Sequence, residues 1–153
     1  MKSDDGRESV NEKVVLVLDD EGTIRRFLCK ICKGLGVSQI LDSGSVSGAL
    51  ELLRKHHVDL VISDLNILDE SGLKIVKTIK SGGEQIAVLI FSGSYVETEK
   101  KKILAAGADM VLRKTVDLSE LEGALCEMLH IQGPTAERAA FLTCSGDTLL
   151  ARS

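Results

Sequence analysis

Four short apolar segments of this chain are each followed by side chains that can do chemistry. The set combines several carboxylates with one hydroxyl and one ammonium group: Asp19, Asp20, Glu21, Asp64, Ser92 and Lys114. Carboxylates that lie close together repel one another, so such a cluster persists only where a proton or a cation offsets its charge. Oxygen ligands of this kind suit Mg²⁺, which is usually held by one or two carboxylates together with water and phosphate oxygens. The residue types therefore indicate a magnesium site that can handle a phosphoryl group, provided that the fold brings them together.

A simpler explanation exists for each of these side chains taken alone. An acidic residue after a strand often caps the next helix, so Asp19 and Asp20 could be caps and Lys114 could lie on the surface. In an open parallel α/β sheet, however, ligands bind outside the carboxyl ends of the strands. Because every one of these strand ends carries a suitable group, a common site is favoured over separate coincidences.

The elements that would position these groups follow from the hydrophobic pattern. Buried, β-branched runs predict strands at Val14–Leu18, Ser38–Leu41, Val58–Ser63, Ile86–Phe91 and Met110–Leu112. Apolar residues at helical spacing predict helices at Thr23–Leu35, Ser45–His56 with Ser45 as the N-cap, Gly72–Lys80, Val96–Ala106 and Leu118–Leu129. Strands that alternate with helices through short links predict an α/β fold, a doubly wound five-stranded parallel sheet with helices on both faces.

Length and composition are those of a globular protein. The 153 residues suit one domain, and the hydrophobic share of 44% and the charged share of 27% are ordinary. The net charge of −4 provides no positive field for nucleic acid or anionic lipid. The apolar runs are too short to span a bilayer and the polar N-terminus is unlike a signal peptide. We therefore expect a cytoplasmic protein without nucleic-acid or membrane partners.

The pattern divides the chain into three parts. We expect a flexible arm over residues 1–12, a folded domain over residues 13–130 and an extension over residues 131–153. Gly133 and Pro134 end the periodic pattern, so the extension is either frayed or a short docking helix. It is too short for a helix-turn-helix output domain.

Cys29 and Cys32 form a C-x-x-C pair, which can be a redox motif or half of a zinc site. A zinc site needs a second pair of ligands, and His56 and His57 are adjacent rather than spaced like metal ligands. A thioredoxin-type motif would open a helix, whereas this pair falls inside a helical pattern. We interpret both cysteines as thiols on or beside a core-facing helix in a reducing cell.

Four motifs, taken together and in order, resemble the receiver domains of response regulators in two-component signalling. They are LVLDDE (16–21), VDLVISDLNILDESG (58–72), LIFSGS (89–94) and GADMVLRK (107–114). The resemblance covers roughly residues 13–130. It implies a CheY-like, flavodoxin-like fold with strand order 2-1-3-4-5. It also implies a phosphorylation switch of the single-domain type, which is not an enzyme beyond its own phosphotransfer and slow autodephosphorylation.

Carried over residue by residue, the resemblance makes Asp64 the phosphoacceptor. The implied metal is Mg²⁺, bound directly by Asp20 and through water or a hydrogen bond by Asp19. The full implied ligand set is Asp19, Asp20, Asp64 and the backbone carbonyl of Asn66. Ser92 would hydrogen-bond the phosphoryl group, and Lys114 would pair with it. The implied donor is a sensor histidine kinase or a histidine phosphotransfer protein, and the implied output is a downstream protein target.

The chemistry suits these roles independently of the family. An aspartate is a competent nucleophile toward phosphorus once a metal offsets the charge of the incoming group. Phosphoryl transfer asks the protein mainly for positioning and charge stabilisation, which Mg²⁺, Lys114 and Ser92 would supply. The product is a labile acyl phosphate, which makes a timed signal.

Three positions depart from the family pattern. Thr115 replaces the proline that usually follows the lysine, and a cis bond there would cost about 3 kcal/mol. The direction of the Lys114 side chain is therefore left open. Leu68 replaces the usual proline in the loop after the phosphoacceptor, which suggests a looser loop. Val111 stands where many receivers have a switching aromatic residue. We therefore expect the conformational change to be confined to the loop after Ser92 and the surface of the helix Val96–Ala106.

Two other classes of protein remain open. The segment LVLDDEGT (16–23) resembles the D-x-D-x-T motif of haloacid-dehalogenase phosphohydrolases, although Glu21 replaces the second aspartate and Asp64 would then have no role. The chain could also be a receiver-shaped interaction module that is never phosphorylated. No site residue is missing, so the sequence favours the phosphorylated switch over both.

Overall fold

The central sheet has five parallel strands in the order β2-β1-β3-β6-β7. The computed structural model describes residues 12–131 except 69, 84, 94 and 96. The sheet strands are β1 (Val14–Leu18), β2 (Gln39–Ser43), β3 (Leu60–Ser63), β6 (Ala87–Ser92) and β7 (Met110–Arg113). This arrangement confirms the predicted doubly wound fold and the strand order that the resemblance implied, since β6 and β7 are the fourth and fifth strands of that order.

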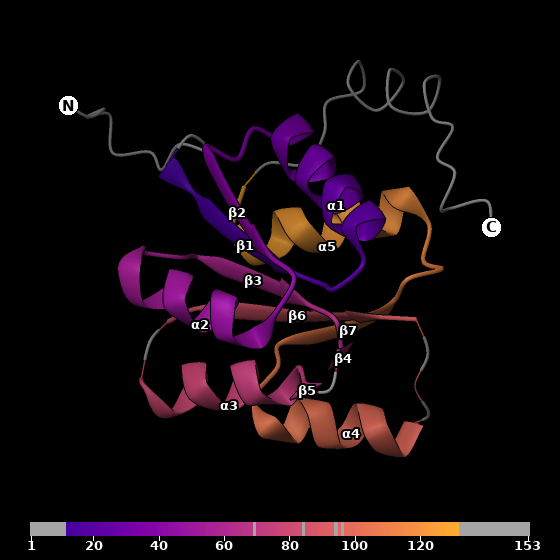
Figure 1. Cartoon of the computed structure of the whole chain (residues 1–153). Coiled ribbons are helices and arrows are strands. Elements are labelled where there is room, and N and C mark those ends of the chain that lie inside the picture. The colour runs from indigo at the N-terminus through magenta and orange to yellow at the C-terminus, as the bar shows by residue number, and fades with distance from the viewer. Residues whose placement is uncertain (1–11, 69, 84, 94, 96, 132–153) are drawn as a thin grey trace.

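Helices cover both faces of the sheet (Figure 1). They are α1 (Gly22–Gly34), α2 (Val46–Lys55), α3 (Leu73–Ser81), α4 (Glu97–Ala106) and α5 (Leu118–Leu129). Helices α1 and α5 lie on one face, and α2, α3 and α4 lie on the other. Ser45 caps α2 as predicted, because its Oγ accepts a hydrogen bond from Gly48 N at 3.1 Å.

Two hydrophobic cores explain why the central strands of the sheet are mostly apolar. Successive side chains of a strand point to opposite faces, so a sheet covered on both sides buries all of them. Along β1, Val15 and Val17 pack with α1 and α5, whereas Leu16 and Leu18 pack with α2, α3 and α4. All four side chains are completely buried. The sheet between the two cores fixes the positions of the strand ends relative to one another.

The predicted elements are found, with boundaries that differ by one or two residues. The third strand begins at Leu60 rather than Val58, and the second runs two residues further, to Ser43. Val96, the predicted start of the fourth helix, lies outside the described residues, as do the arm up to residue 11 and the extension from residue 132. The sequence did not predict the antiparallel hairpin of β4 (Asn66–Ile67) and β5 (Glu70–Ser71).

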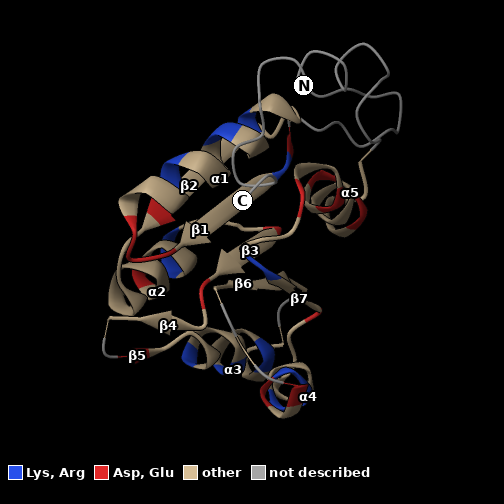
Figure 2. Ribbon diagram, turned by 90° about the vertical axis from the view of Figure 1, so that its right-hand side faces the viewer, with Lys and Arg blue, Asp and Glu red and all other residues tan. Residues whose placement is uncertain are grey.

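The charged residues are mixed over the surface of the domain. Figure 2 shows basic residues along α1 and α3, acidic residues along α5, and both kinds on α4. No helix in the described part of the chain is long and apolar enough to cross a membrane.

Candidate phosphoacceptor and metal site

The carboxyl ends of β1, β3, β6 and β7 bring the predicted site residues to one edge of the sheet. Asp64 follows β3 beside the end of β1, and its N–H donates to Leu18 O at 3.0 Å. At the other end of the row, Lys114 N donates to Ser92 O at 2.8 Å, which extends the pairing of β7 with β6. The same parallel pairing that builds the sheet therefore brings together carboxylates that are far apart in the sequence.

Three of the carboxylates form one compact group. Asp19, Asp20 and Asp64 each offer an oxygen, and these oxygens lie within 4.8 Å of one another. Asp19 is almost completely buried, Asp64 is buried and Asp20 is half-buried. Hard oxygen ligands at this spacing, open to solvent on the side of Asp20, fit the preference of Mg²⁺ for a few carboxylates and several waters.

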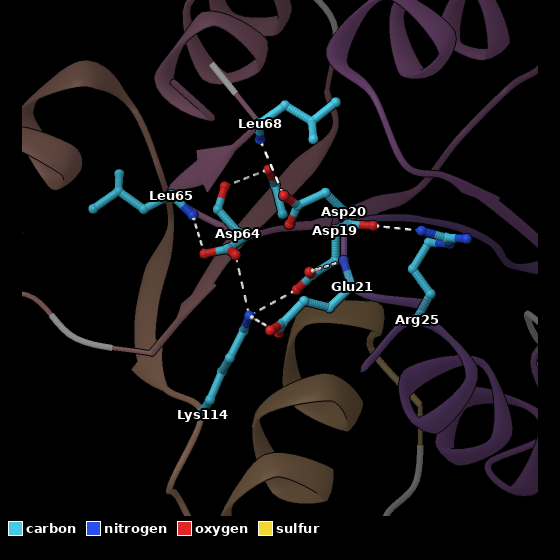
Figure 3. A network of polar contacts seen from close by, with 9 residues as sticks. Asp19, Asp20, Glu21, Arg25, Asp64, Leu65, Leu68 and Lys114 are labelled. Atoms are coloured by element: carbon cyan, nitrogen blue, oxygen red, sulfur yellow. Dashed lines mark hydrogen bonds and ion pairs between the residues drawn. The ribbon is translucent and has the colours of Figure 1, made fainter. Parts of the chain in front are cut away.

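Lys114 provides the positive charge inside this group (Figure 3). Its Nζ lies 2.9 Å from Asp19 Oδ2, 3.1 Å from Asp64 Oδ2 and 3.3 Å from Glu21 Oε1. Burial opposes the charge on Lys114, but the close carboxylates of Asp19 and Asp64 favour the ammonium form, outweigh the effect of burial and raise the pKa of Lys114. Lys114 is thus held protonated beside the carboxylate that the sequence predicted as phosphoacceptor.

Asp19 shows that one cation does not satisfy the group completely. Burial raises the pKa of Asp19, against the lowering effects of the Glu21 N–H, which donates to Asp19 Oδ1 at 2.9 Å, and of Lys114. Within the described residues, Asp19 Oδ2 is shielded from solvent and has Lys114 nearby as an ion pair but no well-aligned hydrogen-bond donor. An incompletely satisfied buried oxygen beside two further carboxylates is a setting that favours a bound cation.

The segment after β3 holds the backbone of Asp64. Leu65 N donates to Asp64 Oδ1 at 2.6 Å, and Ser63 Oγ donates to Asp64 O at 2.8 Å. Gly72 closes this loop, because its N–H donates to Leu65 O at 2.6 Å. A Cβ at Gly72 would overlap the Asp64 carbonyl oxygen, so only glycine allows this approach. The sequence placed Gly72 in the family motif but offered no signal for this contact.

Leu68 makes a contact in this loop that the usual proline could not make. It has φ = 55° at the tip of the β4–β5 hairpin, and its N–H donates to Asp20 Oδ2 at 3.2 Å. Proline has no N–H and is restricted to φ near −65°, so the usual family residue could make neither feature. The replacement of proline therefore ties the hairpin to Asp20.

The remaining predicted positions are placed as follows. Ser92 is buried at the end of β6, and Asn66 is exposed at the start of β4, two residues after Asp64. The bond between Lys114 and Thr115 is trans, as are all peptide bonds of the described residues. The trans bond answers the doubt about Thr115, since Lys114 reaches the carboxylates without a cis bond. Cys29 and Cys32 lie within α1 as free thiols, with Cys32 completely buried in the core, so the prediction that both lie on or beside a core-facing helix is confirmed.

Comparison with known proteins identifies the family of the chain. The response regulator receiver domain family matches residues 15–126, so the chain belongs to that family. The receiver domain is a phosphoacceptor fold of two-component signalling. The match assigns the LVLDDEGT segment to a receiver domain rather than to a phosphohydrolase.

Individual relatives support the assignment over the same part of the chain. The Regulator of RpoS of Escherichia coli K12 is 34% identical over 119 residues, 77% of this chain and 35% of the relative. The sensor histidine kinase RcsC of the same organism is 30% identical over 115 residues, 75% of this chain and 12% of the kinase. The chain therefore spans only about an eighth to a third of the length of these relatives.

Solved structures share the fold. The receiver domain of a DNA-binding response regulator (merR) from Colwellia psychrerythraea 34H superposes with a TM-score of 0.72 at 22% identity, covering 78% of this chain and 99% of that one. The chemotaxis protein CheY4 of Vibrio cholerae superposes with a TM-score of 0.70 at 24% identity, covering 76% and 98%. At this level of identity the likeness establishes the architecture alone.

Proposed function

We propose that this chain is a phosphorylation-dependent switch that accepts a phosphoryl group on Asp64. The observation that carries the proposal is the half-buried Lys114 ammonium, which lies between Asp19 and Asp64 in a group of three carboxylates. A carboxylate held next to a fixed cation and further metal ligands matches the needs of phosphoryl transfer, in which the protein mainly positions groups and stabilises charge.

The proposed donor is a phosphohistidine, on a sensor histidine kinase or a histidine phosphotransfer protein. A carboxylate oxygen of Asp64 attacks phosphorus, the new phosphorus–oxygen bond forms and the phosphorus–nitrogen bond to the donor histidine breaks. Lys114 offers its protons to the oxygens of the transferred group, and Ser92 offers a hydroxyl from the adjacent strand end. The relationship to a sensor kinase receiver segment and to response regulators supports a donor of this class.

Mg²⁺ fits the residues that are present. Asp19, Asp20, Asp64 and the carbonyl of Asn66 would hold it. Bound there, it would offset the charge of the incoming phosphoryl group.

The output would follow from a change in the loop after Ser92 and the surface of α4.

Incubation with acetyl phosphate and Mg²⁺, followed by intact mass measurement, tests the proposal. We expect the mass of one phosphoryl group to be added, and Asp64→Asn to abolish the gain. Asp117→Asn is the matched control, because it removes an exposed carboxylate but leaves a good N-cap for α5. Undiminished labelling of Asp64→Asn would disprove the site, and an unlabelled wild-type protein would favour the receiver-shaped interaction module instead.

A further inference from the structure

Arg25 connects three elements beneath the acidic group. It lies in the first turn of α1, where its Nη1 donates to the backbone oxygen of Asp19 at 2.7 Å. Its Nε donates to Asp42 Oδ2, on β2, at 2.9 Å. Figure 3 shows the guanidinium group reaching the Asp19–Asp20 segment from the side opposite to Leu68. One planar group therefore joins the end of β1, the edge strand and the helix.

Gly44 makes room for this guanidinium group. A Cβ at residue 44 would lie 2.9 Å from Arg25 Nη1 and 3.6 Å from its Cζ. The first distance is too short for carbon and nitrogen in van der Waals contact, so any larger residue would displace Arg25. The Arg25 contact can thus be disturbed from two unrelated positions, residue 25 itself and residue 44.

The hydrogen bond from Arg25 to the Asp19 carbonyl also restrains the backbone of Asp20. The peptide group is planar, so holding the oxygen of Asp19 also fixes the direction of the Asp20 N and Cα. The Asp19 carboxylate has its own restraints, from the Glu21 N–H and from Lys114. The Asp20 carboxylate accepts a 3.2 Å hydrogen bond from Leu68 N–H in the exposed hairpin, so its direction depends mainly on the backbone that carries it.

We propose that Arg25 is a positioning residue of the metal site, which orients the Asp19–Asp20 peptide so that both carboxylates face the bound cation. The inference rests on the proposed function, since it concerns Mg²⁺ held by the same carboxylates. It names no contact between Arg25 and the metal. Arginine suits the task because its rigid fork donates in two directions at once, which the single ammonium of lysine does less well.

The direction of the change in Mg²⁺ affinity distinguishes a positioning role of Arg25 from a simple effect of its charge. Arg25 is a cation close to a cation site, so removing its charge alone would strengthen Mg²⁺ binding. Weaker binding after Arg25→Ala must therefore come from lost orientation. Residues that orient metal ligands from outside typically change metal affinity about 10-fold to 100-fold when removed. We expect Arg25→Ala to fall near the lower end of this range.

The test is calorimetric titration with Mg²⁺ alone, below the metal-free melting temperature of each variant. Arg25→Ala and Arg25→Lys should both raise the half-saturating Mg²⁺ concentration, on the order of tenfold for the alanine variant. Gly44→Ala should weaken binding in the same direction while the arginine and its charge remain. Arg26→Ala is the control, because this exposed arginine follows Arg25 on the same helix, and it should bind Mg²⁺ like the wild type.

Different results of this titration test the role of Arg25 and the proposed metal site separately. Unchanged or tighter binding by Arg25→Ala and Gly44→Ala, beside a wild type that binds, would overturn the role of Arg25 alone. Loss of affinity only in Arg25→Ala, with Gly44→Ala unaffected, would overturn it as well, because the shared geometry would then be irrelevant. A wild type that binds no Mg²⁺ would overturn both this inference and the metal part of the proposed function. If Arg25→Ala does not fold, Arg25→Lys and Gly44→Ala decide the question.

Discussion

Lys114 controls the charge balance of the site at the scale of single residues. Two buried carboxylates and Glu21 share its ammonium group, so the site is compact although the net charge of these four groups is negative. A phosphoryl group on Asp64 would offer new oxygens to the same ammonium group, in competition with Asp19 and Glu21. Redistribution of Lys114 among these partners is the simplest physical link between phosphorylation and a change in structure.

Gly72 sets the backbone of the phosphoacceptor, and replacing it tests that role. Gly72→Ala places a methyl group against the Asp64 carbonyl oxygen, so the loop must shift. We expect a loss of about 1–3 kcal/mol in the free energy of unfolding, together with less labelling by acetyl phosphate. Gly123→Ala is the matched control, because nothing lies within 4 Å of a Cβ there and the residue is in the helix α5, so stability should be unchanged or slightly higher. Equal stability and labelling of Gly72→Ala and wild type would contradict this account.

Cys32 gives the stability of the fold a predictable dependence on alkaline pH. Burial, with a smaller effect from Cys29, raises the pKa of the Cys32 thiol from its ordinary value of 9.0 to about 12. Between these values the unfolded thiol loses its proton while the folded one keeps it, so unfolding becomes more favourable as pH rises. The stabilisation that Cys32 provides is therefore complete below pH 9 and is lost as pH rises toward 12.

Urea unfolding of wild type and Cys32→Ala between pH 7 and pH 11 measures this effect. Both proteins share their lysines and Tyr95, so the difference between their free energies of unfolding isolates the thiol. We expect the difference to be constant up to about pH 9 and then to shrink, as the pKa of Cys32 requires. Parallel pH profiles would show that the folded thiol titrates normally.

Residue types at strand ends were enough to predict most of the site. The sequence predicted Asp19, Asp20, Asp64 and Lys114, and the structure brings their side chains together. Long-range contacts to backbone atoms carried no such signal. Nothing in the sequence shows that Arg25 reaches a carbonyl on another element.

At the scale of elements, the hydrophobic pattern predicted the strands and helices that pack against the cores, but not the short hairpin that local contacts hold. The strands and helices were recognisable because each must bury one or two apolar faces against its neighbours. The hairpin Asn66–Ser71 was not, since strands of two residues show no periodicity. Its turn places Leu68, which is 69% exposed, in a left-handed conformation that favours glycine, and the bond to Asp20 helps to hold it there.

Arg113 at the end of β7 contacts Tyr95 in the loop between β6 and α4. The Arg113 guanidinium lies 4.1 Å from the centre of the Tyr95 ring and donates through Nη2 to Tyr95 O at 2.8 Å. Arg113 pairs with Ser92 in the sheet and directly precedes Lys114. A displacement of Lys114 or Ser92 would therefore reach Tyr95 through Arg113, without any ring moving inward from Val111.

Tyrosine fluorescence tests this route, since Tyr95 is the single tyrosine of a chain without tryptophan. Beryllofluoride with Mg²⁺, a mimic of the phosphorylated state, should change the Tyr95 signal and the amide resonances of residues 97–104. Ser92→Ala and Arg113→Ala should both weaken the response, because each removes one link. Arg54→Ala is the control, since this exposed arginine pairs with Glu51 on α2. An equal Tyr95 response in Arg113→Ala and wild type would contradict this route. Silent α4 amides in the wild type would instead favour output through the loop Asn66–Gly72.

At the scale of the whole molecule, the site and the two cores have opposite energetic roles. The cores on the two faces of the sheet stabilise the fold by burying the apolar side chains of the central strands and of the helices that cover them. The acidic group at the edge of the sheet costs stability, because Asp19 and Asp64 are buried beside Asp20 and share a single ammonium group. A cation bound at this one edge of the sheet should therefore raise the free energy of unfolding of the whole domain.

Thermal unfolding with and without Mg²⁺ tests this coupling. A ligand that binds only the folded state raises stability by mass action, by about 2.7 kcal/mol when its concentration is 100 times its dissociation constant. Mg²⁺ would also relieve the repulsion among the carboxylates, so we expect a higher melting temperature in millimolar Mg²⁺ than in chelator. Asp20→Ala should lose most of the shift if Asp20 is the direct ligand, whereas Asp117→Asn should keep it. Equal melting temperatures of the wild type in metal and in chelator would show that Lys114 alone balances the site, and that Mg²⁺ is not among its ligands in the unphosphorylated state.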